Sequence, residues 1–131
     1  MKDSRRIVFF NAPSQLAGVR DGVRNFLHGE GFSEEEEARL TMAIDEACTN
    51  ILRHSGAMKP ARLEMKKLRH RLRFVLRDYG KPFHPPAVQP CNLKSGQTGG
   101  YGLLIIRTVF DRVDYAPQAR GTRLTLEKLL P

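Results

Sequence analysis

A capped amphipathic helix in the first half of the chain is the feature that most constrains the fold. Ser33 is followed three residues later by Glu36, the spacing of a capping box, and acidic residues 34–37 place negative charge at the positive end of the helix dipole. Beyond them, apolar residues recur at three- and four-residue steps: Leu40, Ala43, Ile44, Ala47 and Ile51. The helix continues to about residue 54, and Ser55 with Gly56 ends it. This stripe predicts one buried helix face.

Two strands are predicted directly after this helix, over residues 61–68 and 72–78. In part of each segment, apolar residues alternate with charged ones: Leu63, Met65, Leu72, Phe74 and Leu76. A tight turn near residues 69–71 joins the two strands. This alternation is typical of a sheet with one buried face.

The other segments complete a small α/β domain. They are a short buried strand at 7–10, a helix that opens at Pro13 and closes at Gly29 and Gly31, a helix at about 102–110, and strands near Val113 and over 122–127. Residues 81–98 are rich in proline and lack periodicity, which favours a functional loop such as a lid. We expect an α/β fold, a two-layer α+β sandwich whose mixed sheet is covered by helices on one face. A length of 131 residues fits one domain, residues 1–131.

The charge balance favours anionic partners. The chain has 22 Lys+Arg against 14 Asp+Glu, a net charge of +8, and much of the excess lies between residues 59 and 77. Aromatic residues make up 8% and tryptophan is absent, which argues against a base-stacking platform, so we expect no specific nucleic-acid binding. No apolar stretch is long enough for a membrane helix, and two cysteines make no disulfide framework. These features favour a cytoplasmic protein without a membrane partner.

Two motifs carry candidate polar chemistry. Glu46, Asn50 and His54 stand four residues apart, so they share a stripe beside the apolar one. A carboxylate can accept a proton, and an amide oxygen can bind a hard cation such as Mg²⁺. Asp78 ends an apolar strand, and Gly80 two residues later lets a flat ligand approach the backbone. Taken alone, either pattern also suits a solvated helix face or an ordinary turn.

A glycine-rich segment, Gly99-Gly100-Tyr101-Gly102-Leu103, runs into an apolar helix. Backbone amides at a helix N-terminus can bind phosphate, although a glycine-rich turn alone is common. In chain order, Glu-x3-Asn, Asp-x-Gly, Gly-Gly-x-Gly-Leu and then Gly121-Thr122 resemble the GHKL (Bergerat-fold) ATPase/kinase superfamily. The resemblance covers about residues 40–126. Within the superfamily, the chain is most similar to the small bacterial anti-sigma-factor serine/threonine kinases.

The resemblance implies a role for each of these positions. Glu46 would be the general base and Asn50 would hold Mg²⁺ on the phosphates of ATP. Asp78 would accept a hydrogen bond from the adenine amino group, Gly80 would leave room for the base, and Thr122 would support Asp78 through its hydroxyl. The implied cofactors are therefore ATP and Mg²⁺.

The same resemblance assigns the phosphates to the backbone of Gly100, Gly102 and Leu103. Three cations could serve as charge partners for the phosphates, and the sequence does not choose among them: Lys81, Lys94 and Arg107. His54 has a structural hydrogen-bonding role as its simplest interpretation, and Cys48 that of a small buried residue.

The implied function is phosphorylation of a Ser or Thr on a STAS-type anti-anti-sigma protein, with a sigma factor as a second, sequestered partner. The usual homodimer of the family is a further expectation, which no feature of this sequence establishes. Two alternatives stay open: an ATP-binding adaptor of the same fold that acts by partner binding, and a nucleic-acid binder suggested by the charge.

Overall fold

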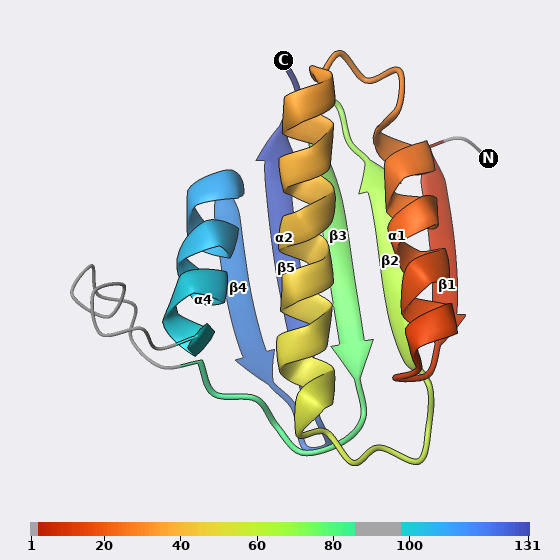
Figure 1. The fold of residues 1–131 in the computed structure, drawn as a ribbon, viewed down its shortest axis with the longest axis vertical. Coiled ribbons are helices and arrows are strands. Elements are labelled where there is room, and N and C mark those ends of the chain that lie inside the picture. Colours follow the sequence, from red (N-terminus) through yellow and green to blue (C-terminus); the bar gives the residue numbers. More distant parts are fainter. Residues whose placement is uncertain (1–2, 86–97) are drawn as a thin grey trace.

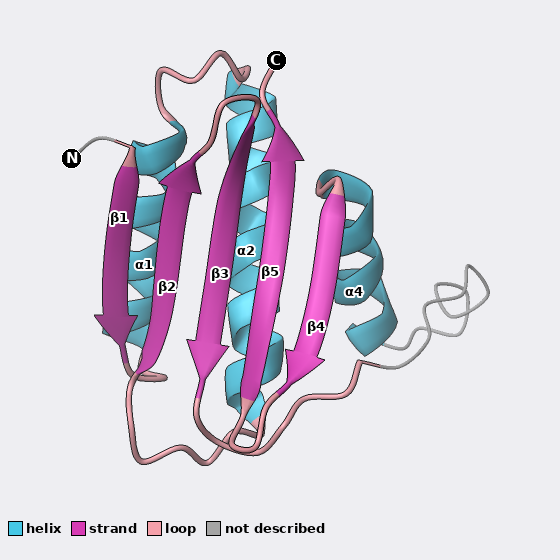
Figure 2. Cartoon of the chain, turned by 180° about the vertical axis from the view of Figure 1, so that it is seen from behind, coloured by secondary structure: helices cyan, strands magenta, loops and turns pink. Residues whose placement is uncertain are grey.

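The computed structural model describes residues 3–85 and 98–131. Its elements in chain order are β1 (Ser4–Phe9), α1 (Pro13–Leu27), α2 (Glu34–Arg53), β2 (Ala61–Lys67), β3 (Arg71–Asp78), α4 (Thr98–Val109), β4 (Arg112–Pro117) and β5 (Thr122–Leu129). The strands form one sheet in the order β1-β2-β3-β5-β4. The helices lie together on one face of this sheet (Figure 1), and the other face is open (Figure 2). The two-layer α/β fold is confirmed.

One detail of the sheet differs from the expectation, because every strand pair that the structure describes is antiparallel rather than mixed. Helix α4 carries the chain back between β3 and β4, so these two strands run in the same direction (Figure 2). They are not neighbours, since β5 returns from β4 and lies between them. The helical crossover from β3 to β4 is therefore present, but β3 and β4 do not form a parallel pair because β5 separates them.

The core lies between the sheet and α2. The capping box is confirmed: Ser33 Oγ accepts from the Glu36 amide at 3.1 Å, and the Glu36 carboxylate accepts from the Ser33 amide at 3.3 Å. The apolar stripe of α2 is buried, as are the alternating apolar residues of β2 and β3. Phe74 packs edge-on between Phe26 and Phe110, at centroid distances of 5.9 and 6.0 Å.

The first strand was expected to be buried, and it is an exposed edge. β1 pairs only with β2 in the described part of the chain, so Phe9 and part of Ile7 face the core while Val8 is 58% exposed. An apolar run of four residues does not reveal which side of a strand is open. Among the residues that the structure describes, no helix is long and apolar enough to cross a membrane.

Candidate functional site

Asp78 lies at the end of β3 and is held by one group close to it in sequence and one far from it. Its side chain is 0% exposed. One carboxylate oxygen, Oδ1, accepts a hydrogen bond from Ser55 Oγ at 2.9 Å, and Oδ2 accepts from the Gly80 amide at 3.1 Å. A carboxylate offers about four acceptor positions, so this buried group can accept further hydrogen bonds. An exocyclic amino group is a fitting donor.

Ser55 is the residue that sequence reasoning missed. It lies just beyond α2 and is buried, and besides binding Asp78 its carbonyl accepts from the Lys81 amide at 2.8 Å. A serine after a helix indicates only a helix end, because nothing local shows that its hydroxyl reaches a strand 23 residues away. Ser55 therefore joins the end of α2 to the end of β3.

The glycine at position 80 has a structural reason of its own. A Cβ built there would lie 2.1 Å from the Ser55 carbonyl oxygen and 2.1 Å from Ser55 Oγ. Gly80 therefore lets the turn after β3 close around Ser55. Room for a nucleotide base at this position stays a prediction.

Thr122 of β5 and Tyr115 of β4 lie on the strands beside Asp78. Thr122 is fully buried and pairs with Asp78 across β3 and β5, but its hydroxyl accepts from the Phe83 amide at 2.7 Å. The Phe83 ring packs against Tyr115 of β4 with centroids 5.4 Å apart. The segment that leads toward residues 86–97 is thus anchored on β5 and β4.

The three residues of the polar stripe of α2 differ in burial. Asn50 is 7% exposed and Glu46 is half-buried, whereas His54 is exposed at the end of the helix. Burial raises the pKa of the Cys48 thiol to about 12, and Asp45 adds to that rise. Cys48 is therefore a protonated, unreactive side chain, consistent with a small buried residue.

Tyr115 links this stripe to the strands beside Asp78. Burial raises the pKa of Tyr115 to about 12; the Arg107 guanidinium opposes that rise, while Cys48 and Glu46 add to it. The hydroxyl therefore lies within electrostatic reach of Glu46 and Arg107. It is buried without a hydrogen-bond partner among the described residues. A buried hydroxyl without a partner suits a site that is completed by a ligand oxygen.

The residues present fit a magnesium nucleotide. Asp78 can accept from a base, the Tyr115 hydroxyl can donate to a phosphate oxygen, and the Asn50 amide oxygen is a ligand type that Mg²⁺ accepts. Mg²⁺ commonly takes one or two protein ligands together with substrate phosphates, and Asn50 would supply such a ligand here.

The glycine-rich segment forms the start of α4, which begins at Thr98, four residues earlier than expected. The unpaired amides of a helix lie in its first turn. Gly100 falls in that turn, whereas the amides of Gly102 and Leu103 fall where the regular helical ladder begins. Leu103 is buried. Phosphate binding by these three backbones stays a prediction.

Two of the three cations that were candidates for binding the phosphates lie within the described residues. Lys81 and Arg107 are exposed, and Arg107 lies near Tyr115. Lys94 and most of the predicted lid, residues 81–98, lie outside the described residues.

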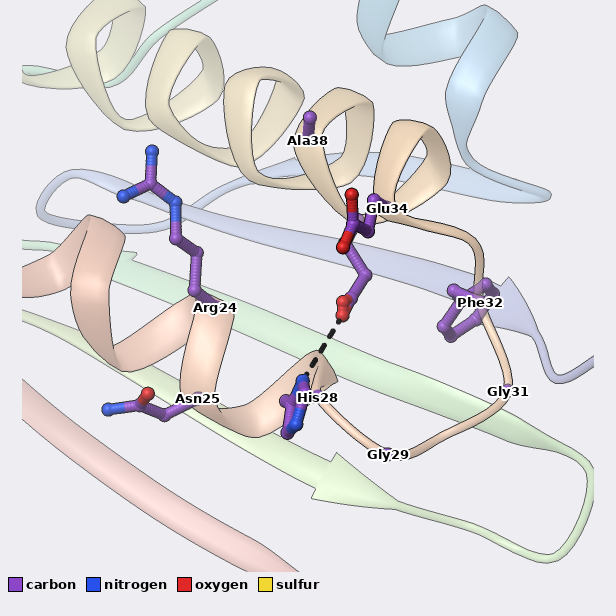
Figure 3. A pocket seen from close by; sticks show the side chains of 9 residues that line it. Arg24, Asn25, His28, Gly29, Gly31, Phe32, Glu34 and Ala38 are labelled. Atoms are coloured by element: carbon purple, nitrogen blue, oxygen red, sulfur yellow. Dashed lines mark ion pairs between the residues drawn. The ribbon is translucent and has the colours of Figure 1, made fainter.

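The structure has a cavity beside Asp78 and a larger hollow away from the predicted site residues. A cavity of about 200 Å³ touches Asp78 and Ser55. The rest of its lining comes from the α2–β2 connection, including Lys59, and from the β1–α1 connection, including Asn11; Glu46 does not line it. A larger open hollow of about 710 Å³ lies at the N-terminal end of α2, where the chain passes from α1 into α2 (Figure 3). There His28 and Glu37 form an ion pair at 3.7 Å. None of the described residues that line this larger hollow is a predicted site residue.

Known proteins share this fold and parts of this sequence. A model of the histidine kinase-like ATPase domain matches residues 9–128. The serine-protein kinase RsbW of Halalkalibacterium halodurans is 26% identical over 132 residues, covering 91% of this chain and 79% of that protein.

Solved structures show the same fold. The RsbU and RsbW domains of a Mycobacterium tuberculosis protein match 98% of this chain with a TM-score of 0.72 and 18% identity, and this chain spans 33% of that one. A histidine kinase domain from a blue-light activated histidine kinase of Erythrobacter litoralis matches 89% of this chain and 60% of its own, with a TM-score of 0.56 and 17% identity.

Proposed function

The chain belongs to the histidine kinase-like ATPase domain family, and from this premise we propose that it is a serine/threonine protein kinase that uses ATP and Mg²⁺. In this proposal residues 1–131 form one kinase domain that acts as an anti-sigma factor in the cytoplasm. It phosphorylates a STAS-type anti-anti-sigma protein and sequesters a sigma factor, and a homodimer is the expected assembly. The likeness to a serine-protein kinase supports this choice of reaction.

The observation that carries the proposal is the buried Asp78 carboxylate. Ser55 and Gly80 fix both of its oxygens, yet it keeps acceptor capacity. Adenine offers an amino group to such an acceptor, whereas guanine presents a carbonyl at the same place. A buried polar mismatch of this kind can discriminate by about 10⁴-fold or more.

The proposed reaction transfers the γ-phosphoryl group to a Ser or Thr hydroxyl. The hydroxyl oxygen forms a bond to the γ-phosphorus, the bond from that phosphorus to the β,γ-bridging oxygen breaks, and ADP leaves. Glu46 accepts the hydroxyl proton, and its position on α2 four residues before Asn50 puts base and Mg²⁺ ligand on one stripe. Mg²⁺, when bound, neutralises the phosphate charge.

Intact-mass measurement tests the proposal directly. The full chain is incubated with Mg-ATP and a candidate STAS-domain protein, and an added phosphoryl mass on that protein is expected. Glu46→Gln should slow the transfer by about 10²-fold or more, because a positioned base contributes that much, with ATP affinity little changed. The matched control is Glu35→Gln, an exposed glutamate of the same helix paired with Arg39 at 3.4 Å.

Two outcomes would contradict the proposal. Wild-type transfer rates in Glu46→Gln would remove the proposed base. Binding of ATP without any transfer to the STAS protein would favour the adaptor of the same fold.

A further inference from the structure

Strand register arranges the charged side chains of the open face of the sheet in rows across the strands; Figure 2 shows the strands from this side. Strand register places residues side by side: Lys66, Arg73, Glu127 and Arg112 form one row. In that row Glu127 is buried among arginines, with Arg73 at 2.7 Å, Arg112 at 3.6 Å and Arg71 at 3.7 Å. Opposite charges therefore meet directly in this part of the face.

A second row contains no acid. Arg62 of β2 pairs with Arg77 of β3, and Arg77 pairs with Arg123 of β5, so three arginines lie directly opposite one another. We call these three residues the arginine row. Directly opposed side chains have Cβ atoms about 4.5–5.5 Å apart, and like charges in such pairs are destabilising. The fold keeps this arrangement at a cost to the free protein.

The contacts within the described part of the chain neutralise the positive charge of the row only in part. Arg62 Nε lies 3.1 Å from a carboxylate oxygen of Glu64 in the neighbouring row, but the same oxygen lies 3.6 Å from Arg6, so two arginines share one carboxylate. Arg77 donates to the carbonyls of Arg120 and Thr122 and stacks at 4.2 Å on Tyr79, so no carboxylate in the described part of the chain neutralises it. The exposed Arg123 makes no ion pair within residues 3–85 and 98–131.

We propose that the arginine row is a docking surface for an acidic protein partner, whose carboxylates bind the three guanidinium groups. Arginine presents a planar fork of donors that matches a carboxylate with two parallel hydrogen bonds. A partner that brings carboxylates to this row removes the repulsion that the free protein carries. The surface faces away from the helix layer and from Asp78, so it is separate from the proposed nucleotide site.

The surroundings of the row favour a protein over a nucleic acid. Its two ends are apolar, because Val8 pairs with Arg62 and Ala116 pairs with Arg123, and Val8 is 58% exposed. A protein partner can cover such groups, and arginine with apolar neighbours is typical of interface centres. The carboxylate of Glu64, in the neighbouring row, would repel a continuous phosphate backbone. The row itself contains no aromatic residue to stack a base, and the Tyr79 ring beside it is already covered by the Arg77 guanidinium.

Binding to defined probes tests this surface. The first probe is a fluorescent peptide of alternating Glu and Val, the second is the same peptide with Gln in place of Glu, and the third is a twelve-residue oligothymidylate. The full chain is titrated with each at two salt concentrations. The variant Arg62→Gln/Arg77→Gln/Arg123→Gln removes the row, and the matched control Arg24→Gln/Arg39→Gln/Arg53→Gln removes three exposed charges from the helix layer.

We expect the row variant to bind the Glu–Val peptide at least tenfold more weakly, and the control variant to stay within twofold of wild type. Equal losses in both variants would reduce the effect to net charge and overturn the proposal. Tighter, row-dependent binding of the oligothymidylate would overturn it in favour of a nucleic acid.

A second variant covers the case in which loss of Arg77 disturbs the strand end. Arg62→Gln/Arg123→Gln keeps the carbonyl contacts of Arg77 and should still weaken peptide binding at least threefold, with ATP binding unchanged. In the free protein, Arg123→Gln should raise the melting temperature at low salt and not at 0.5 M salt, because salt screens repulsion between exposed charges. A lower melting temperature at low salt would show that Arg123 is already compensated, and would overturn the argument.

Discussion

Replacing Gly80 with alanine tests whether the turn after β3 really closes around Ser55. The added Cβ would meet the Ser55 carbonyl oxygen at 2.1 Å, so either the turn or the end of α2 has to move by more than 1 Å. That movement opposes the hydrogen bond from the Lys81 amide to the Ser55 carbonyl, 2.8 Å long, and the bond from Ser55 Oγ to Asp78, 2.9 Å long.

The expected loss follows from these two contributions. Overpacking a close contact costs about 1–3 kcal/mol, and weakening a hydrogen bond adds about 1 kcal/mol. We therefore expect Gly80→Ala to lower the free energy of unfolding by about 2–4 kcal/mol. Urea denaturation followed by circular dichroism measures this value, because a domain of this size usually unfolds in one step.

Gly18→Ala is the matched control. Gly18 lies within α1, and a Cβ added there would have no neighbouring atom within 4 Å, so alanine meets open space. This change should stabilise the protein by about 0.5–1 kcal/mol, because alanine favours a helix more than glycine does. An unchanged stability of Gly80→Ala, combined with weaker ATP binding, would refute the reasoning and show that position 80 is kept open for the ligand instead.

Three further predictions concern buried polar groups. Ser55→Ala should destabilise the protein by about 1.5–3 kcal/mol in urea denaturation, because the buried Asp78 carboxylate loses a hydrogen-bond donor; a change below about 0.5 kcal/mol would contradict that bond. Burial acts to raise the pKa of Glu127, but Arg73, Arg71 and Arg112 outweigh it and hold that pKa below its usual range. Glu127→Gln should therefore lower the free energy of unfolding at pH 7 by about 1–3 kcal/mol. The difference in stability between wild type and variant should shrink as the pH falls through the lowered pKa of Glu127. A difference that does not depend on pH would contradict the ion pairs. In a Cys91→Ser background, the Cys48 thiol, whose pKa is about 12, should react with a maleimide at pH 8 only after denaturation, as intact mass will show; rapid labelling of the folded protein would contradict its burial.

Local patterns predicted the helices and strands well, because each pattern reports its own element. The Ser33–Glu36 box and the apolar stripe indicated the start and the buried face of α2, and the alternation in β2 and β3 indicated which residues face the core. The exposure of β1 could not be predicted in this way. Whether an apolar strand is central or at an edge depends on its neighbours, and within the described residues β1 has one neighbour only.

The sequence proposes members for the candidate site, but it does not predict the contacts that surround them. Asp78, Asn50 and Glu46 were selected by spacing and resemblance, and the structure places Asp78 and Asn50 in buried positions. The role of Ser55 depends on a contact across 23 residues, and that of Tyr115 on a strand that follows α4. Contacts of this kind follow from tertiary packing, which local propensity does not report.

The two sides of the β3 end illustrate the same limit. Alternation along a strand predicts that Arg77 and Asp78 point to opposite faces, one to the open side and one to the helix layer. It does not predict that Arg62 and Arg123 stand beside Arg77, because that juxtaposition requires the register of three strands. A shift of one residue in either pairing would turn the neighbouring side chain to the other face and remove the arginine row. The basic composition of residues 59–77 therefore becomes a directed surface only through the fold, which is why net charge alone could not choose among the partners.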